Sequence, residues 1–347
     1  MEETTPDLTW TDAATLRIEG QAWPDESQPW TRLPDRAEGS VPDRVWDLSR
    51  ASAGIRVRFV GAITVAAVRW RLTAGGPLSH MPDSGSSGFD LYARELGAPA
   101  TAWRHVRAAW PARDHDQPQE QVILEGMDGT EREYCLYLPL YRGATDIQIG
   151  TDGTISAAAA DTSPVVAFYG TSIVHGGCAN RPGMAYPAQI ARKLGINHIN
   201  LGFSGNGKCQ PPVVDLLTEL TPDVWVVDPL PNLSGEELEP AVHDALVAIG
   251  KAHPDIPILA VPSPDYANSW ISASRSERVK SSNESLVRAV TRAQQAGVQV
   301  TLPGGDFSQR LFGTDGEGTV DGTHPTDLGF LRMAETIGAE VAKLLGR

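Results

Sequence analysis

The strongest constraint on the fold is a change of pattern near Ser163. Beyond this residue, short apolar runs alternate five times with longer segments whose apolar residues recur at helical spacing. Alternation of this kind is typical of a parallel sheet with helices on both faces. The expected strands are 165–169, 196–201, 224–227, 258–261 and 298–302, and the expected helices are 185–194, 213–220, 236–252, 276–296 and 328–345. The sequence therefore predicts a three-layer α/β domain over residues 163–347, with a five-stranded parallel sheet.

The first 155 residues follow a different pattern. Segments 55–59 and 68–72 alternate apolar and polar residues, as half-buried antiparallel strands do. Asp128-Gly129 offers a hairpin turn before a further strand at 134–140, in which Pro139 should lie at an edge or an end. Seven of the nine tryptophans lie here, and strand tryptophans more often fill a sandwich core than form a sugar-binding platform. We predict an antiparallel β-sandwich over residues 1–155, joined by a linker at 151–161.

Composition excludes several classes of function. The formal net charge of −14, without any Lys/Arg block, argues against a nucleic-acid partner. No apolar run is long enough to span a membrane, and the acidic, polar start of the chain does not resemble a secretory signal. An odd number of cysteines without C-x-x-C spacing favours free thiols in a reducing compartment, so we expect a cytoplasmic protein. No metal-ligand cluster or nucleotide-binding fingerprint is recognisable, and we expect neither a bound metal nor a bound cofactor.

A first candidate for chemistry lies where strand 165–169 ends. This strand leads directly into Gly170-Thr171-Ser172, and a glycine there allows a sharp turn that presents Ser172 at the carboxyl edge of the sheet. Val174 occupies the last position of the G-x-S-x-G elbow, so the ordinary α/β-hydrolase motif is absent. A serine in this position alone more often caps a helix than attacks a substrate.

A second candidate is the segment Asp321-Gly322-Thr323-His324, just before the last helix. A D-x-x-H pair on a tight loop lets the carboxylate reach one ring nitrogen of the imidazole, which fixes the tautomer and stabilises the imidazolium. The alternative is that Asp321 and His324 merely cap the helix or line a turn.

Two further segments, 200–207 and 228–232, follow predicted strands and should reach the same edge of the sheet. Backbone N–H groups of a Gly-rich bend and an Asn amide could bind the oxyanion of a tetrahedral intermediate, together with the Ser172 N–H. Gly-rich loops also bind phosphates, and Asn beside Pro is common in turns. Each segment is ambiguous alone, but four in this order along one sheet are not.

Together these blocks resemble the SGNH (GDSL) hydrolase superfamily, and in particular a two-domain branch of it. Gly88-Phe89-Asp90-Leu91-Tyr92 is similar to the Gly-x-Asp-Leu-Tyr signature of the β-rich N-terminal module of that branch. The resemblance extends from about residue 33 to 345. It implies a flavodoxin-like catalytic domain preceded by a sandwich of the jelly-roll, carbohydrate-binding-module type.

By resemblance, Ser172 is the nucleophile, His324 the base and Asp321 its orienting acid, with Ser172, Gly205 and Asn232 as oxyanion donors. The usual Gly-Asp-Ser is Gly-Thr-Ser here, and only the Asn of the Gly-x-Asn-Asp block is present. Candidates for substrate binding are His175, Arg181, Asp90 and Tyr92. His175 would more often be a pocket-wall or helix-end histidine, and Arg181 could equally brace its loop in a salt bridge. Cys178 is a rival nucleophile only if its pKa is depressed, and packing is the simpler interpretation.

The expected chemistry is acyl transfer through an acyl-Ser172 intermediate. The branch is similar to acyltransferases that modify polyketides, which favours transfer from a thioester such as acyl-CoA to a hydroxyl of a bulky small molecule. The alternatives are an esterase or deacetylase acting on a carbohydrate or small molecule, and a carbohydrate-binding protein with a vestigial catalytic domain. If the N-terminal module shapes the pocket, a chain starting near Ser163 should fold but lose activity.

Overall fold

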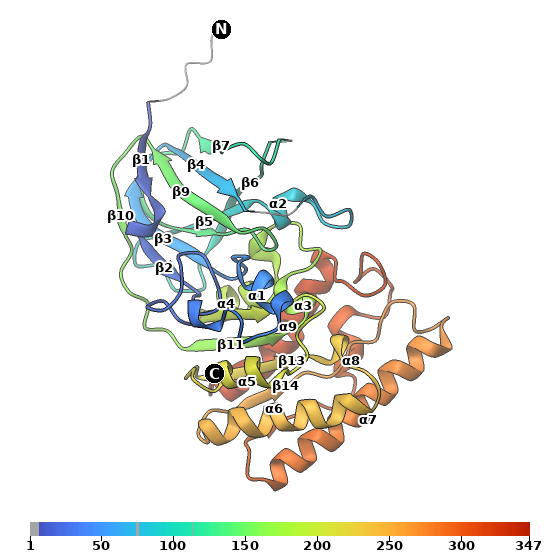
Figure 1. The fold of residues 1–347 in the computed structure, drawn as a ribbon. Coiled ribbons are helices and arrows are strands. Elements are labelled where there is room, and N and C mark those ends of the chain that lie inside the picture. Colours follow the sequence, from blue (N-terminus) through green and yellow to red (C-terminus); the bar gives the residue numbers. More distant parts are fainter. Residues whose placement is uncertain (1–6, 74–75, 113) are drawn as a thin grey trace.

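The computed structural model describes residues 7–73, 76–112 and 114–347, which form a β-rich half stacked on an α/β half (Figure 1). Most of the blue and green strands lie in the β-rich half, and the yellow and red helices belong to the α/β half.

The α/β half is built on a five-stranded parallel sheet with the strand order β12-β11-β13-β14-β15. This is the flavodoxin-like order, so the predicted fold class is confirmed. The strands are β11 Val165–Gly170, β12 Asn197–Gly202, β13 Val224–Asp228, β14 Ile258–Ala260 and β15 Val300–Thr301. The helices are α3 Ser172–His175, α4 Tyr186–Leu194, α5 Pro211–Leu217, α6 Leu238–Ala252, α7 Ala273–Gln295, α8 Phe307–Phe312 and α9 Asp327–Leu344. The sequence did not predict the short helices α3 and α8.

Both faces of this sheet are buried. Alternate residues of β11 point to opposite sides: Ala167 and Tyr169 pack with α5 and α6, whereas Val166 and Phe168 pack with α4 and α9. Burial on both faces explains why these strands are continuous apolar runs rather than alternating ones.

The β-rich half consists of two antiparallel sheets that enclose a separate apolar core, as the sandwich prediction required. Trp30 and Trp70 fill that core, whereas Trp110 is partly exposed. One sheet has the order β1 Thr9–Asp12, β9 Ala144–Thr151, β4 Val65–Leu72 and β7 Gln119–Glu125. The other has the order β10 Ile155–Ala157, β3 Arg56–Ala62, β8 Glu131–Tyr137, β5 Phe89–Glu95 and β6 Arg104–Ala109, and β2 Arg17–Glu19 also pairs with β3. Two short helices, α1 Asp43–Ser49 and α2 Asp83–Ser86, interrupt this half.

Two local predictions in this half are wrong. Asp128-Gly129 does not make a hairpin, because β7 and β8 on either side of it belong to different sheets. The turn instead carries the chain from one sheet to the other, and an ion pair between Asp128 and Arg132 fixes it. The segment 151–161 is not a plain linker either, since β10 lies within it and pairs with β3. Pro139 lies beyond the end of β8, as expected.

The segment before β3 belongs to the core of the α/β half. Trp23, Leu33 and Leu48 are buried in the same apolar cluster as Tyr169 and Phe203. A chain starting near Ser163 would expose this part of the cluster to water, at a cost of about 25 cal/mol per Å² of apolar surface. The expectation that such a chain folds by itself therefore does not fit the structure.

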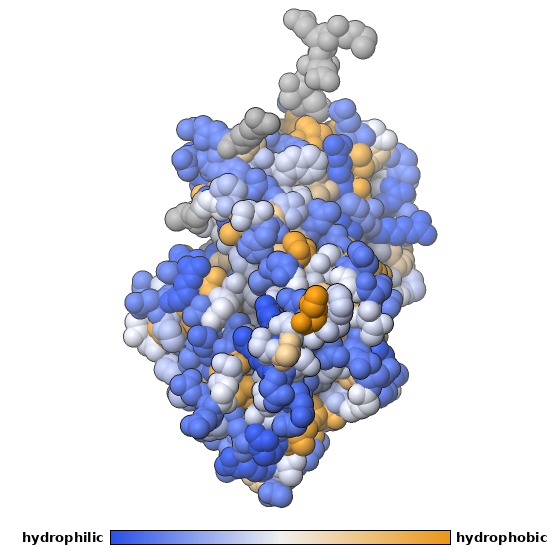
Figure 2. Space-filling model, turned by 90° about the vertical axis from the view of Figure 1, so that its right-hand side faces the viewer, coloured by the Kyte–Doolittle hydropathy of each residue, from blue (hydrophilic) through white to orange (hydrophobic). Residues whose placement is uncertain are grey.

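Apolar side chains at the surface are mostly isolated. The face in Figure 2 carries small hydrophobic patches among hydrophilic residues. No helix among the described residues is long and apolar enough to cross a lipid bilayer.

Candidate active site

The candidate nucleophile is the first residue of α3, directly beyond β11. Only glycine fits at Gly170, because a Cβ there would lie 2.4 Å from the Asp228 carbonyl oxygen and 2.5 Å from Val174. The Thr171 hydroxyl caps α3 by accepting a backbone hydrogen bond. Since Thr171 has that role, the Ser172 hydroxyl is not used as the helix cap. It is left available at the carboxyl edge of the sheet.

Ser172, His324 and Asp321 form one hydrogen-bonded chain. Ser172 Oγ lies 2.9 Å from His324 Nε2, and His324 Nδ1 lies 2.7 Å from Asp321 Oδ2. The other Asp321 oxygen accepts the backbone N–H groups of His324 and Thr323 at 2.8 and 3.0 Å. Helix α9 is capped by Thr326 instead, so the capping alternative for Asp321 and His324 does not apply. This arrangement can move a proton from the serine to the imidazole while the carboxylate stabilises the resulting charge.

Asp321 is held ionised. Partial burial opposes ionisation, but hydrogen bonds from the backbone and ring of His324 and from Thr323 outweigh it and lower the pKa of Asp321 to about 2. The carboxylate therefore contributes stability above about pH 4, its unfolded range, and loses that contribution as the pH falls towards 2. Across the neutral range it carries the charge that an imidazolium needs.

Replacing Asp321 tests this part of the site. Asp321→Asn should lower kcat/KM for an aryl ester by about 10³–10⁴-fold, because a neutral amide neither stabilises the imidazolium nor fixes its tautomer. Asp315→Asn is the matched control, since Asp315 pairs with Arg332 at the surface. A loss of less than tenfold in Asp321→Asn, measured beside that control, would contradict the role.

The predicted oxyanion donors follow neighbouring strands that end in register. Gly170 of β11 pairs with Gly202 of β12 and Asp228 of β13, so the loops carrying Gly205 and Asn232 emerge beside Ser172. Among the described residues, the Gly205 N–H donates to no backbone carbonyl, and the Asn232 amide oxygen is buried without a partner. An N–H donor that is free at this edge is what an oxyanion site requires.

The Gly-x-Asp-Leu-Tyr motif lies in the contact between the two halves. The buried carboxylate of Asp90 accepts hydrogen bonds from Arg181 at 2.7 Å and from the Gly183 N–H at 3.0 Å. Tyr92 is also buried, and its hydroxyl accepts a bond from Arg181. The expectation that Asp90, Tyr92 and Arg181 bind substrate does not fit these placements. They attach the sandwich to the loop before α4, and Arg181 braces that loop.

His175 is likewise not placed to contact a substrate. It is fully buried, and its Nε2–H donates to the Leu140 carbonyl at 2.6 Å. Its ring stacks on Tyr141, with the centroids 4.2 Å apart. Burial and the nearby Arg32 cation hold the pKa of His175 well below its usual range, so the ring is neutral.

Two residues that the sequence did not single out, Tyr141 and His80, lie beside the triad together with Cys178. A Cβ placed on Gly177 would lie 2.8 Å from the Tyr141 hydroxyl and 3.2 Å from the His324 ring. The tyrosine and the imidazole therefore lie on either side of Gly177. The ring of His80, from the loop between β4 and α2, has its centroid 5.6 Å from that of His324. Cys178, considered above only as a nucleophile, belongs to the same group. Burial and the Asp321 charge raise the pKa of Cys178 to about 12, which argues against a nucleophilic thiolate.

Asp228 gives the protein a pH-dependent stability. Burial raises the pKa of Asp228 to about 8, although a hydrogen bond from Tyr186 opposes the shift. An unfolded Asp titrates near pH 4, so the folded chain binds the extra proton between about pH 4 and 8 and loses stability as the pH rises through that range. The Tm of the wild type should therefore fall by several degrees between pH 5 and 8 because of Asp228, and Asp228→Asn should remove that part of the fall. If Tm falls by the same amount over this pH range in Asp228→Asn and in the exposed control Asp215→Asn, Asp228 is not the cause.

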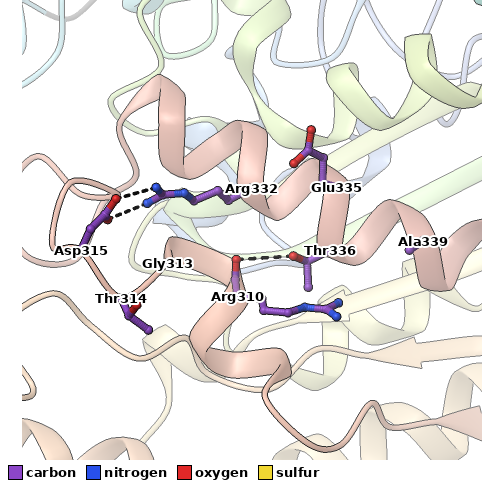
Figure 3. Close-up of a pocket in the computed structure, with 8 residues that line it drawn as sticks. All are labelled: Arg310, Gly313, Thr314, Asp315, Arg332, Glu335, Thr336 and Ala339. Carbon is purple, nitrogen blue, oxygen red and sulfur yellow. Dashed lines mark hydrogen bonds and ion pairs between the residues drawn. The ribbon is translucent and has the colours of Figure 1, made fainter.

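Two cavities differ in their relation to the site. One of about 790 Å³ lies between the segment around α1 and the loop that carries Tyr141, so Tyr141 lines it but no residue of the triad does. It also contains Arg44, Arg50 and Arg142 against a single carboxylate, Asp47. The other, of about 620 Å³, lies between α8 and α9 (Figure 3), and no residue of the triad lines it. The Arg332–Asp315 ion pair lies in its wall.

Comparisons with known proteins agree with this geometry. The model of the GDSL-like lipase/acylhydrolase family matches residues 163–342, and the GxDLY model, the N-terminus of SGNH-hydrolase-type esterases, matches residues 8–156. The crystal structure of a candidate GDSL-like lipase from Bacteroides ovatus ATCC 8483 is 31% identical, covers 98% of each chain and has a TM-score of 0.90. No curated protein sequence matches the chain.

Two more distant structures share the fold. The salicylyl-acyltransferase SsfX3 from a tetracycline biosynthetic pathway is 19% identical over 97% of each chain, with a TM-score of 0.74. A family two carbohydrate esterase from Clostridium thermocellum, in complex with cellohexaose, is 16% identical over 85% of this chain and 93% of its own, with a TM-score of 0.52.

Proposed function

Since the chain belongs to the GDSL-like lipase/acylhydrolase family, we propose that it forms an acyl-enzyme on Ser172 and passes the acyl group to a hydroxyl of a bulky small molecule. The two family matches confirm the resemblance predicted from the motifs. The observation that carries the proposal is the continuous chain of hydrogen bonds from Ser172 Oγ through His324 to Asp321.

In the first half-reaction, Ser172 Oγ attacks the carbonyl carbon of an acyl donor while its proton passes to His324 Nε2. The carbonyl oxygen becomes an oxyanion, which the N–H groups of Ser172 and Gly205 and the Asn232 amide bind. Collapse of this intermediate breaks the bond to the leaving group, which takes the proton from His324. A thioester such as acyl-CoA is the proposed donor, and its leaving group is the free thiol.

In the second half-reaction, the acceptor hydroxyl gives its proton to His324 and its oxygen attacks the acyl carbon. The bond to Ser172 Oγ breaks, and His324 returns the proton to the serine. Water in place of the alcohol would give hydrolysis, so the acceptor decides between the two outcomes.

One feature favours an alcohol acceptor. The cavity of about 790 Å³ that Tyr141 lines has the size of small-molecule sites, and its three arginines favour an acceptor with a negative charge.

Ester hydrolysis is the second candidate. The similarity at 31% identity to a candidate GDSL-like lipase favours it, and the substrate would be an acyl ester of a carbohydrate or small molecule. A carbohydrate-binding protein with a vestigial site is disfavoured, because the Ser172, His324 and Asp321 hydrogen bonds are intact.

Competition between water and alcohols tests the proposal. The enzyme is mixed with p-nitrophenyl butyrate and either benzyl alcohol or 4-(hydroxymethyl)benzoate, and the butyrate ester and free butyrate are quantified. Three results would support transfer: p-nitrophenol appears in a burst near one equivalent, alcohol makes the steady phase faster, and the carboxylate-bearing acceptor yields more ester than benzyl alcohol. Steady release with free butyrate as the sole product at every alcohol concentration would establish a hydrolase instead.

A further inference from the structure

Three metal-binding side chains meet at the edge of the candidate active site. One ligand atom each of His80, Cys178 and His324 lies within 4.8 Å of the other two. They come from the loop between β4 and α2, the loop after α3, and the loop before α9. The sequence contains no metal-binding motif among them, so only the packing of the sandwich on the α/β half brings His80 to the other two.

The ligand types are those of a zinc site. Two imidazoles and one thiolate bind zinc and similar soft divalent cations, whereas magnesium and calcium prefer oxygen ligands. Tetrahedral zinc with bonds of about 2.0–2.3 Å holds its ligand atoms about 3.3–3.7 Å apart. The present spacing reaches that geometry if the side chains move by on the order of 1 Å, and water can supply the fourth ligand.

The surroundings of each ligand fit this arrangement. His324 Nδ1 is bonded to the Asp321 carboxylate, which is the outer-shell contact that usually orients a metal-binding imidazole. Its Nε2 is therefore the coordinating atom. The His80 side chain is exposed, whereas Cys178 is buried beside His324. Cys178 also has a φ of +74°, an uncommon backbone conformation for a residue with a side chain.

We propose that His80, Cys178 and His324 form an inhibitory site for a soft divalent cation such as Zn²⁺. The cation takes the lone pair of His324 Nε2, and Cys178 releases its thiol proton to solvent as the sulfur–metal bond forms. His324 can then no longer accept the Ser172 proton, since Nε2 is the atom that faces Ser172 Oγ at 2.9 Å. The inhibitory effect rests on the proposed function, whereas the binding of the metal does not.

Cobalt spectroscopy tests binding without reference to catalysis. We expect Co²⁺ to bind the purified full-length protein at one equivalent, with the d–d absorption of a tetrahedral site and a thiolate-to-cobalt charge-transfer band. Zn²⁺ should displace the Co²⁺ and so abolish both absorption bands. Cys178→Ser should lose the charge-transfer band, whereas Cys209→Ser, which alters another buried cysteine, should keep it. Ser172→Ala should keep both bands although it is inactive. No tetrahedral spectrum in the wild type, or a charge-transfer band in Cys178→Ser, would overturn the site.

Inhibition provides the second test. The Zn²⁺ concentration that halves p-nitrophenyl butyrate turnover should rise at least about tenfold in His80→Ala, and no such rise is expected in His243→Ala, a histidine on α6. Unchanged inhibition in His80→Ala would mean that zinc acts elsewhere. If the wild type had no activity, the proposed function would fail, while the cobalt spectra would still decide whether the site exists.

Discussion

Ser172→Ala should reduce p-nitrophenol release from p-nitrophenyl butyrate by at least about 10⁴-fold, because no other nucleophile among the described residues is bonded to His324 Nε2. Cys178 is the nearest alternative, but its raised pKa of about 12 leaves almost no thiolate at neutral pH. The remaining hydrogen bonds of His324, from its backbone N–H and its Nδ1 to the Asp321 carboxylate, do not depend on the serine hydroxyl. The variant should therefore fold normally and fail only in chemistry.

Mass spectrometry after brief exposure to the ester separates this loss from other defects. The wild type should gain one acyl group, on the peptide that contains Ser172, and Ser172→Ala should gain none. Ser156→Ala, an exposed serine in β10, is the control and should behave as the wild type. Acylation of Ser172→Ala at a rate near that of the wild type would remove Ser172 as the nucleophile.

Arg32→Ala should lower the free energy of unfolding by at least about 3 kcal/mol. The guanidinium is 1% exposed and donates to the carbonyls of Ala51, Asn200, Gly202 and Leu48 at 2.8, 3.2, 2.7 and 2.6 Å. Burial lowers the pKa of Arg32 to about 9, yet the side chain remains protonated at neutral pH. Its loss leaves several buried carbonyls without donors and a cavity against Phe203.

Urea denaturation measures this effect. Arg36→Ala is the matched control, since Arg36 lies four residues further along and forms exposed ion pairs with Glu26 and Glu219, so its loss should cost within about 1 kcal/mol. Arg32→Lys should recover only part of the stability, because an ammonium group cannot make the same set of directed bonds. If Arg32→Ala and Arg36→Ala unfold at the same urea concentration, Arg32 does not stabilise the packing of the segment before β3 on β12.

Arg32 also links stability to the candidate site. Two of its acceptors lie in β12, and Gly202 ends that strand just before the loop that carries Gly205. We therefore expect a small loss of activity in Arg32→Lys even where the protein remains folded, because an oxyanion donor works only when it is held in position.

The sequence by itself determined the parts of this protein that depend on local pattern. The alternation of buried runs and helical segments predicted the sheet, because a strand covered on both faces must be apolar throughout. The sequence also identified the candidate site residues. Asp321 and His324 are three residues apart on one loop, and Ser172, Gly205 and Asn232 each follow a strand that ends at one edge of a parallel sheet.

Only the tertiary structure decided the contacts between the two halves. The Gly-x-Asp-Leu-Tyr motif was recognisable, but its burial against Arg181 was not, because an Asp in a strand shows neither its partner nor its exposure. The sequence likewise did not show the partners of Arg32, Tyr141 and His80, which reach the α/β half from segments far away in the chain. Their positions follow from how two separately patterned cores pack together. Sequence periodicity reports which face of an element is buried, and it does not report what covers that face.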